Sequence, residues 1–262
     1  MMFEIKMMFR LLRASAKSQV MYRADFMVGL VGTLLYNGTF LVSVGVLTSR
    51  FGSIGGYSAE EIVLLFALFE VAHGLYGFFL QNMATYLNVL VMEGKLDIYF
   101  LRPCGILTQL SGMKMNYTAY VDLVIGLAAL GAAYVSLGTA WGFRWLLVPV
   151  FAVSGAFIEF ALALLLNCST VLFPNARSLY GAWYQLITMG QRYPLNIFGK
   201  GFMTLLTFLF PLGFMNYYPM RYLMGRENGW IGCLSPVVAA VFTALAVKVF
   251  HAVLKRYAGT GN

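Results

Sequence analysis

Residues 26–49 form a run without a single charged side chain, with Arg23 and Asp25 just before it and Arg50 directly after it. A helix needs about 20 apolar residues to cross the roughly 30 Å hydrocarbon core of a bilayer, so this run is long enough to span a membrane. Only 11% of the 262 residues are charged, whereas soluble domains average about 25%. Because so few charges cannot cover the surface of a soluble domain, the chain is predicted to be an integral membrane protein.

The remaining composition excludes several other classes. Three scattered cysteines and two histidines provide too little material for a disulfide scaffold or a histidine-based metal site, so no metal is expected. The net charge of +8 is explained by basic cytoplasmic loops, which are typical of membrane proteins. We therefore expect no nucleic-acid partner.

The hydropathy pattern predicts an all-α membrane protein with six transmembrane helices. The assignment of the fifth helix is open, because residues 178–199 and 201–220 are both apolar. If both crossed, the basic C-terminus and the basic N-terminus would lie on opposite sides, against the positive-inside rule. Charge counting alone favours 201–220 as the span, but Pro211 and Pro219 interrupt it, and broken helices at membrane depth are typical of re-entrant elements. The preferred spans are residues 26–49, 62–86, 115–137, 145–172, 178–196 and 230–250, with 197–223 dipping in from the outer side.

The distribution of basic residues gives the orientation. Most Lys and Arg lie on one side if both termini are cytoplasmic, which is the arrangement that the positive-inside rule favours. Residues 1–23 fit this side, because their cations share one arc of a helix and their apolar side chains share the neighbouring arc, as in an interfacial amphipathic helix. The outer side then holds Arg50, Arg144, Arg192, Lys200, Arg221 and Arg226.

No catalytic signature is present. Gly94-Lys95-Leu96 resembles the end of a phosphate-binding loop, but the upstream glycine and the Ser or Thr that would hold magnesium are missing. The chain also lacks GxSxG and HExxH patterns. We therefore expect that it is not an enzyme and does not hydrolyse ATP itself.

Ionisable groups inside the predicted spans are the first candidate site. A carboxylate that faces lipid costs several kcal/mol, so these groups must face protein or a water-filled cavity. They could attract a cationic or polar substrate along a translocation path, or they could form hydrogen bonds between helices; Asp122 could instead pair with Lys114. Glu70 and His73 are three residues apart and so share one helix face. The candidates for the path are Glu70, His73, Asp122, Glu159, Tyr184 and Gln185.

The second candidate site is the polar segment between the second and third spans. Residues 91–103 mix charges with large apolar side chains in a short segment, predicted to be helical, that Pro103 ends. A solvated loop has little reason to carry so many apolar side chains. We expect them to be buried in the headgroup zone or, preferably, in a groove on another protein.

Three stretches resemble a known family. Residues 93–103, Glu-Gly-Lys-Leu-Asp-Ile-Tyr-Phe-Leu-Arg-Pro, resemble the inner loop of permease subunits of type-2 ABC transporters. Residues 192–198 with 209–219, and the tail 255–261, are similar to further segments of those permeases. Within that class, the chain resembles the paired export permeases of similar length, in which two different permeases often accompany one ATPase.

The resemblance implies an exporter half with a coupling helix inside residues 88–112, between spans two and three. It implies two copies of a separate ABC ATPase, which bind ATP and Mg²⁺, a second and different permease, and location in a bacterial-type inner membrane. The chain itself is then expected to hold no cofactor. The residues expected to couple it to the ATPase are Glu93, Gly94, Lys95, Leu96, Asp97, Tyr99, Phe100 and Arg102.

Two other functions compete with this hypothesis. A proton-coupled secondary transporter could use the membrane carboxylates as a relay, but the two halves of the sequence carry no visible inverted repeat. A purely structural membrane subunit needs no path at all. The substrate cannot be read from the sequence, although aromatic spans with a few acids suit amphipathic or cationic compounds.

Overall fold

The computed structural model describes residues 4, 6–8, 10–11, 23–113, 116, 118–137, 142–172, 181, 184–185 and 191–257. Its regular elements in these ranges are helices, which confirms the predicted all-α class. Most of the predicted interfacial helix (1–23) and of the predicted fifth span (178–196) lies outside the described residues, so the count of six spans stays a prediction.

The elements are α2 (Arg23–Phe51), α3 (Ala59–Phe79), α4 (Gln81–Met92), α5 (Leu96–Phe100), α6 (Ile106–Leu110), α7 (Thr118–Ser136), α8 (Val148–Leu172), α10 (Lys200–Phe208), α11 (Tyr217–Leu223) and α12 (Ser235–Arg256), with short 3₁₀ helices at Phe143–Leu147, Leu195–Phe198, Leu212–Phe214 and Gly229–Leu234.

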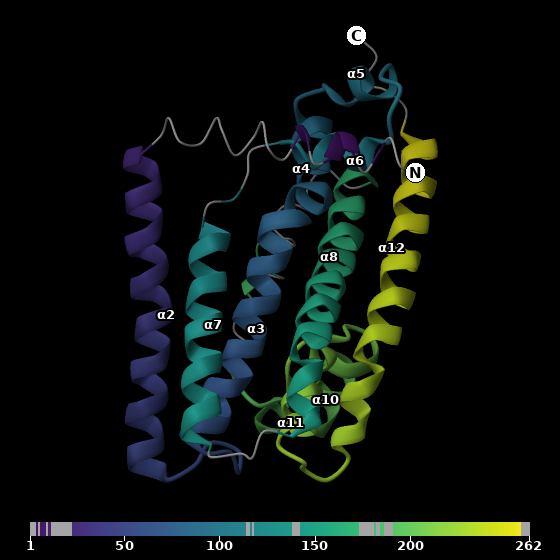
Figure 1. The fold of residues 1–262 in the computed structure, drawn as a ribbon. Coiled ribbons are helices and arrows are strands. Elements are labelled where there is room, and N and C mark those ends of the chain that lie inside the picture. The colour runs from purple at the N-terminus through teal and green to yellow at the C-terminus, as the bar shows by residue number, and fades with distance from the viewer. Residues whose placement is uncertain are drawn as a thin grey trace.

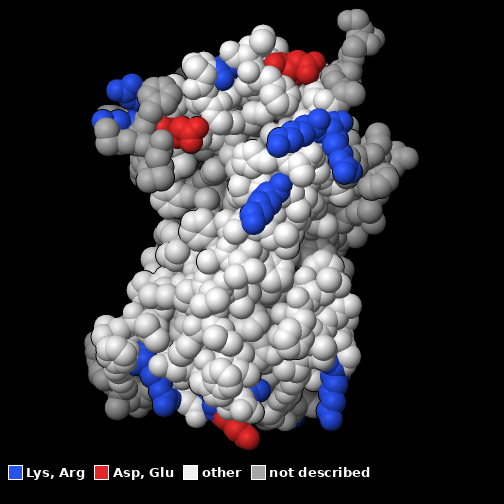
Figure 2. All heavy atoms as spheres, turned by 90° about the vertical axis from the view of Figure 1, so that its right-hand side faces the viewer, with Lys and Arg blue, Asp and Glu red and all other residues white. Residues whose placement is uncertain are grey.

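Within the described residues, five helical segments are long and apolar enough to cross a membrane. Four of them are centred on α2, α3, α7 and α12, and the fifth joins the 3₁₀ helix at Phe143–Leu147 to α8. Figure 1 shows these helices side by side in the order α2, α7, α3, α8, α12, and the contacts between α2 and α7, α7 and α3, α3 and α8, and α8 and α12 agree. Figure 2 shows that, on the face turned to the viewer, charged side chains gather toward the two ends and leave an uncharged band between them.

The two ends of the bundle differ. At one end, the short helices α5 and α6 lie near the last turns of α12, and we call this the α5–α6 end (Figure 1). At the opposite end lie α10 and α11, with α11 in contact with α3, and we call this the α10–α11 end (Figure 1). The chain therefore places residues 93–103 and residues 200–223 at opposite ends of the bundle.

Helix α3 is the centre of the bundle. In its most apolar window 72% of the residues are buried, against 17% for α2 and 22% for α12. A helix that is apolar all round and buried lies in the core, whereas apolar side chains left exposed on outer helices must meet lipid or another protein. Helices α2 and α12 therefore present the outer apolar faces.

Two glycines allow α3 and α7 to approach closely. A Cβ atom on Gly74 would lie 2.8 Å from the backbone nitrogen of Leu123, and a Cβ atom on Gly126 would lie 2.7 Å from the backbone nitrogen of Val71. Real Cβ atoms do not come that close to backbone, so only glycine fits at these positions. Small residues at a helix interface allow this kind of close packing in membranes.

The predicted second span, residues 62–86, corresponds to two helices. Helix α3 ends at Phe79, and α4 begins at Gln81. The polar side chains at the break pair with the segment before α7: the amide of Asn116 donates to Gln81 Oε1 at 2.8 Å, and the amide of Asn82 donates to the carbonyl of Met113 at 3.4 Å. These contacts hold α4 at the α5–α6 end, apart from the axis of α3.

Candidate functional site

Three predicted path residues, Glu70, Asp122 and Glu159, are buried inside the bundle, and His73 is half-buried. Glu70 and His73 belong to α3, Asp122 to α7 and Glu159 to α8. Glu70 is 1% exposed and Glu159 is 3% exposed. Although Glu70 and His73 share a helix face, His73 pairs with Glu159, whose Oε1 lies 2.7 Å from His73 Nδ1. The structure therefore brings together carboxylates from three helices.

Arg192 joins this group. Its Nη2 donates to Glu70 Oε1 at 3.2 Å and to Asn37 Oδ1 at 2.6 Å. The amide of Asn37 in turn donates to Asp122 Oδ1 at 3.4 Å. Asp122 thus has a partner on α2, whereas the alternative partner Lys114 lies outside the described residues. Neither Arg192 nor Asn37 was among the predicted site residues. Arg192 was assigned to the outer side by charge alone, and the structure shows that it is buried, with only 6% of it exposed.

Aromatic rings surround the Arg192 guanidinium. Its Cζ lies 4.1 Å from the ring centre of Tyr36, 5.1 Å from that of Phe40 and 5.6 Å from that of Phe66. A buried cation needs an ion partner and further favourable contacts to offset the loss of water, and cation–π contacts supply part of this. The ion pair and the rings together hold the turn at residues 191–194 against α2 and α3.

A second set of hydrogen bonds ties the same turn to the short helices. Asn216 donates from its amide to the carbonyls of Gln191 at 2.6 Å and Leu65 at 3.2 Å. The side chain of Gln191 donates to the carbonyl of Leu212 at 3.1 Å. All three contacts are buried, so residues 191–216 are anchored to α3 by polar side chains rather than by apolar packing alone.

Asn37, Glu70, His73, Asp122, Glu159 and Arg192 together form what we call the charge network. Its two halves differ in how accessible they are to solvent. The half formed by Glu70, Arg192 and Asn37 is closed on all sides, since each of the three is buried. The other half is partly open: the side chain of His73 is 12% exposed, and its ring centre lies 6.4 Å from that of Tyr184, which is half-buried.

Two further path candidates lie in the open half. Tyr184 faces the His73 ring, and the next residue, Gln185, is exposed. Glu159 Oε2 is buried without a hydrogen-bond partner in the part of the chain that the structure describes. A buried carboxylate oxygen without a partner requires an explanation, such as a bound ligand, a proton or water. A polar ligand that reaches His73 and Tyr184 could supply that partner.

The predicted coupling segment forms a compact cap at the α5–α6 end. Gly94 ends the turn after α4 with a φ of 65°, a conformation that favours glycine. Buried Gln109 on α6 then fixes the loop, because its Nε2 donates to the carbonyls of Tyr99 at 2.9 Å and Cys104 at 2.8 Å. Leu96 is fully buried, so it anchors α5 and does not face outward.

Four apolar side chains project from this cap, and we call them the apolar tip. Leu101 is 86% exposed, Met92 60%, Ile98 52% and Phe100 49%. Of these four only Phe100 was among the predicted coupling residues; Met92, Ile98 and Leu101 were absent, because the sequence does not say which side chains of the segment face outward. Such a set of exposed apolar side chains marks an interaction site.

The predicted polar coupling residues lie in the same segment as the apolar tip. Glu93, Lys95, Asp97 and Arg102 are exposed. Lys95 Nζ lies 2.8 Å from Glu93 Oε2, and this hydrogen bond raises the pKa of the Lys95 ammonium group. Tyr99 is half-buried beneath the Arg102 guanidinium, which lies 5.0 Å from the centre of its ring. An apolar centre with a charged rim is the usual anatomy of a protein interface.

The comparisons with known proteins give the family. The family model described as "ABC-2 family transporter protein" matches residues 34–261, which include the whole charge network and the apolar tip. No curated protein and no solved structure matches the chain. The described residues contain no group of three or more His, Cys, Asp or Glu that could hold a metal ion. With its apolar helices and this match over nearly its whole length, the chain belongs to the ABC-2 family of transporter permeases, multi-pass membrane proteins that work with an ABC ATPase.

Proposed function

We propose that this chain is the membrane-spanning permease subunit of an ATP-driven exporter. A separate ABC ATPase docks on the apolar tip, and a second, related permease completes the translocation path. The observation that carries the proposal is the apolar tip itself, since Leu101 is 86% exposed at the end of a compact cap. Two ATPase copies are expected to bind ATP and Mg²⁺, whereas this chain is not an enzyme and holds no cofactor.

This arrangement requires the α5–α6 end and both termini to face the cytoplasm, because ATP is present there. The membrane is then a bacterial-type inner membrane. Residues 197–223, the predicted outer re-entrant segment, fall at the opposite end, as this orientation requires (Figure 1). The exposed basic residues Lys255 and Arg256 at the end of α12 lie on the cytoplasmic side in agreement with the positive-inside rule.

Packing supports a route by which the ATPase can move the membrane helices. Buried Leu87 and Leu90 of α4 and Leu96 of α5 belong to the same apolar cluster as Leu164 and Cys168 of α8. Packed cores transmit displacement because they resist compression. A shift of the apolar tip when the ATPase binds ATP is therefore passed through α4 to α8, the helix that carries Glu159.

We place the translocation path at the open half of the charge network. His73, Glu159, Tyr184 and Gln185 line it, and the carboxylate of Glu159 favours a cationic or polar group on an amphipathic substrate. Glu70 and Asp122, with Arg192, form the closed half, which holds the helices and the 191–216 segment in register. A bound substrate shifts the equilibrium between the inward-facing and outward-facing states of the permease only as far as its affinities for the two states differ.

Co-purification tests the docking assignment. The double change Ile98→Asp and Leu101→Asp places two charges in the centre of the proposed interface, where unpaired charges are costly. We expect it to reduce recovery of the ATPase at least tenfold while the chain remains in the membrane. The matched control, Leu101→Met, keeps an apolar tip and should retain the ATPase. Equal recovery with the double variant and the control would refute docking at the tip.

A proton-coupled transporter is the second candidate, and the His73–Glu159 pair in a membrane helix bundle favours it. The two hypotheses differ in energy source. Transport that stops when ATP is depleted supports the ABC permease, whereas transport that survives ATP depletion and collapses with a protonophore supports the alternative. A purely structural subunit predicts that transport persists in cells without the chain.

A further inference from the structure

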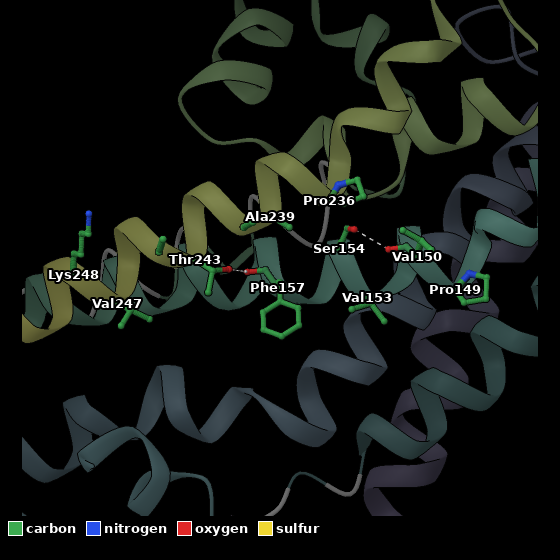
Figure 3. Close-up of a pocket in the computed structure, with 12 residues that line it drawn as sticks. Pro149, Val150, Val153, Ser154, Phe157, Pro236, Ala239, Thr243, Val247 and Lys248 are labelled. Carbon is green, nitrogen blue, oxygen red and sulfur yellow. Dashed lines mark hydrogen bonds between the residues drawn. The ribbon is translucent and has the colours of Figure 1, made fainter. Parts of the chain in front are cut away.

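An apolar groove runs along the outer face of α8 and α12. It encloses about 960 Å³ between residues 149–157 of α8 and residues 236–248 of α12. Figure 3 shows the lining residues spaced along α12 from Pro236 through Ala239 and Thr243 to Val247 and Lys248, with the Lys248 side chain pointing away from Val247. Neither the charge network nor the apolar tip contributes to this groove.

The groove offers an occupant almost no hydrogen-bonding groups. The hydroxyl of Ser154 donates to the carbonyl of Val150 at 2.7 Å, and that of Thr243 donates to the carbonyl of Phe157 at 3.4 Å (Figure 3). Both hydroxyls are thus satisfied within the protein. What remains is an apolar channel along the helices, which suits a hydrocarbon chain.

One end of the groove carries positive charge. Lys248 lines this end, and Lys255 follows seven residues later on the same face of α12. Both side chains are exposed, and neither forms an ion pair with another described residue. Exposed lysines of this kind can extend their ammonium groups to the level of lipid phosphates. The unpaired positive charge therefore favours an anion beside the apolar channel.

The length of the groove matches one lipid leaflet. The stretch from Pro236 to Lys248 on α12 rises by roughly 18 Å at 1.5 Å per residue. One leaflet of the hydrocarbon core is about 15 Å thick. An acyl chain lying in the groove would thus bring its headgroup to Lys248, at the side of the α5–α6 end.

We propose that this groove binds one anionic phospholipid, with an acyl chain between α8 and α12 and the phosphate at Lys248. A helix from a second protein would fill the apolar part, but an apolar helix would leave the two lysines without an anionic partner. Charge complementarity therefore favours the lipid. The site is independent of the proposed export function, so either can fail without the other.

Photolabelling tests this proposal on the full-length chain in phosphatidylcholine nanodiscs. The probe is phosphatidylglycerol with a diazirine in one acyl chain, compared with the same probe on phosphatidylcholine. We expect the label on peptides of α8 and α12, and more from the anionic probe than from the zwitterionic one. The proposal would be overturned if the label were spread equally over other exposed apolar helices such as α2. It would also be overturned if the two probes gave equal yields, and neither result requires a variant of the chain.

Variants separate the two parts of the site. Lys248→Gln is expected to lower labelling by the anionic probe about fivefold, the loss typical of one lysine near a lipid headgroup. Ala240→Phe fills the groove and should lower labelling by both probes, whereas Val241→Phe, at a position 58% exposed outside the groove, should not. If Ala240→Phe and Val241→Phe behave alike, or if Ala240→Cys crosslinks to another protein chain in native membranes, the groove does not hold a lipid.

Discussion

Arg192 shows how strongly a single residue can depend on partners far away in the chain. Asn37, which accepts its shortest hydrogen bond, is 155 positions earlier, and Glu70 is 122 positions earlier. Removing one partner of a buried ion pair leaves the other charge uncompensated, at a cost of about 3–5 kcal/mol. The main role of the closed half of the charge network is therefore structural.

The first prediction follows from this pair. Glu70→Gln removes the only charge within ion-pair distance of Arg192 in the described chain, so we expect a clearly lower unfolding temperature in detergent. The control is Glu60→Gln, an exposed carboxylate in the first turn of the same helix, which should change stability by less than about 0.5 kcal/mol. Equal unfolding temperatures for the two variants would contradict a structural role for Glu70.

The second prediction concerns the open half. Glu159→Gln removes the charge but keeps a hydrogen-bonding group near His73, so we expect it to change the stimulation of ATPase activity by cationic amphipathic compounds more than it changes stability. The measurement is ATP hydrolysis by the purified complex with and without a panel of such compounds. Unchanged stimulation, together with a loss of stability like that of Glu70→Gln, would place Glu159 in the structural half.

The sequence was sufficient to find the membrane carboxylates, because a charge inside an apolar run is visible without a structure. It was not sufficient to find Arg192, because charge counting assigns a cation to one side of the membrane and does not say whether packing buries it. The contacts that bury Arg192 come from α2 and α3, and no local pattern encodes them. The difference between the open and the closed half likewise depends on how four separate segments pack.

At the level of helices, the α3–α7 contact sets the geometry of the network, because α3 carries Glu70 and His73 while α7 carries Asp122. The contact is close because Gly74 and Gly126 lack side chains. Neither glycine belongs to a GxxxG pattern in its own helix, so their role could not be predicted from the sequence.

The third prediction tests this contact. In a helix, Gly→Ala normally stabilises by up to about 1 kcal/mol, yet the Cβ of Gly126→Ala would lie 2.7 Å from backbone that cannot move aside. We expect this variant to unfold at a lower temperature than the wild type. Gly131→Ala on the same helix, with nothing within 4 Å of its Cβ, should be unchanged or slightly more stable. A stabilised Gly126→Ala would mean that α3 and α7 are less tightly packed.

The cap at the α5–α6 end shows a different limit of prediction. The sequence indicated a short helix with apolar side chains, but it did not indicate that Leu96 faces inward and Leu101 outward. That choice depends on buried Gln109, which binds the backbone of the segment from α6. The break between α3 and α4 was missed for a similar reason, since polar contacts with the segment before α7 produce it.

For the whole molecule, the structure combines a buried polar network, outer apolar faces and an exposed apolar tip at one end. The fold class and the family follow from sequence patterns that extend over most of the chain, such as long apolar runs. The interfaces do not, because each depends on which side chains remain uncovered once the helices have packed. The proposed function depends on the tip, since a permease that is powered by a separate ATPase must receive its energy through a contact.

Site-specific crosslinking at Leu101 tests this contact most directly. A photoreactive amino acid replaces Leu101, and the crosslinked products in native membranes are identified by mass spectrometry. The account predicts a product that joins this chain to an ABC ATPase and whose yield changes when ATP is added. Crosslinks to lipid or to proteins outside the cytoplasm, with none to an ATPase, would contradict it.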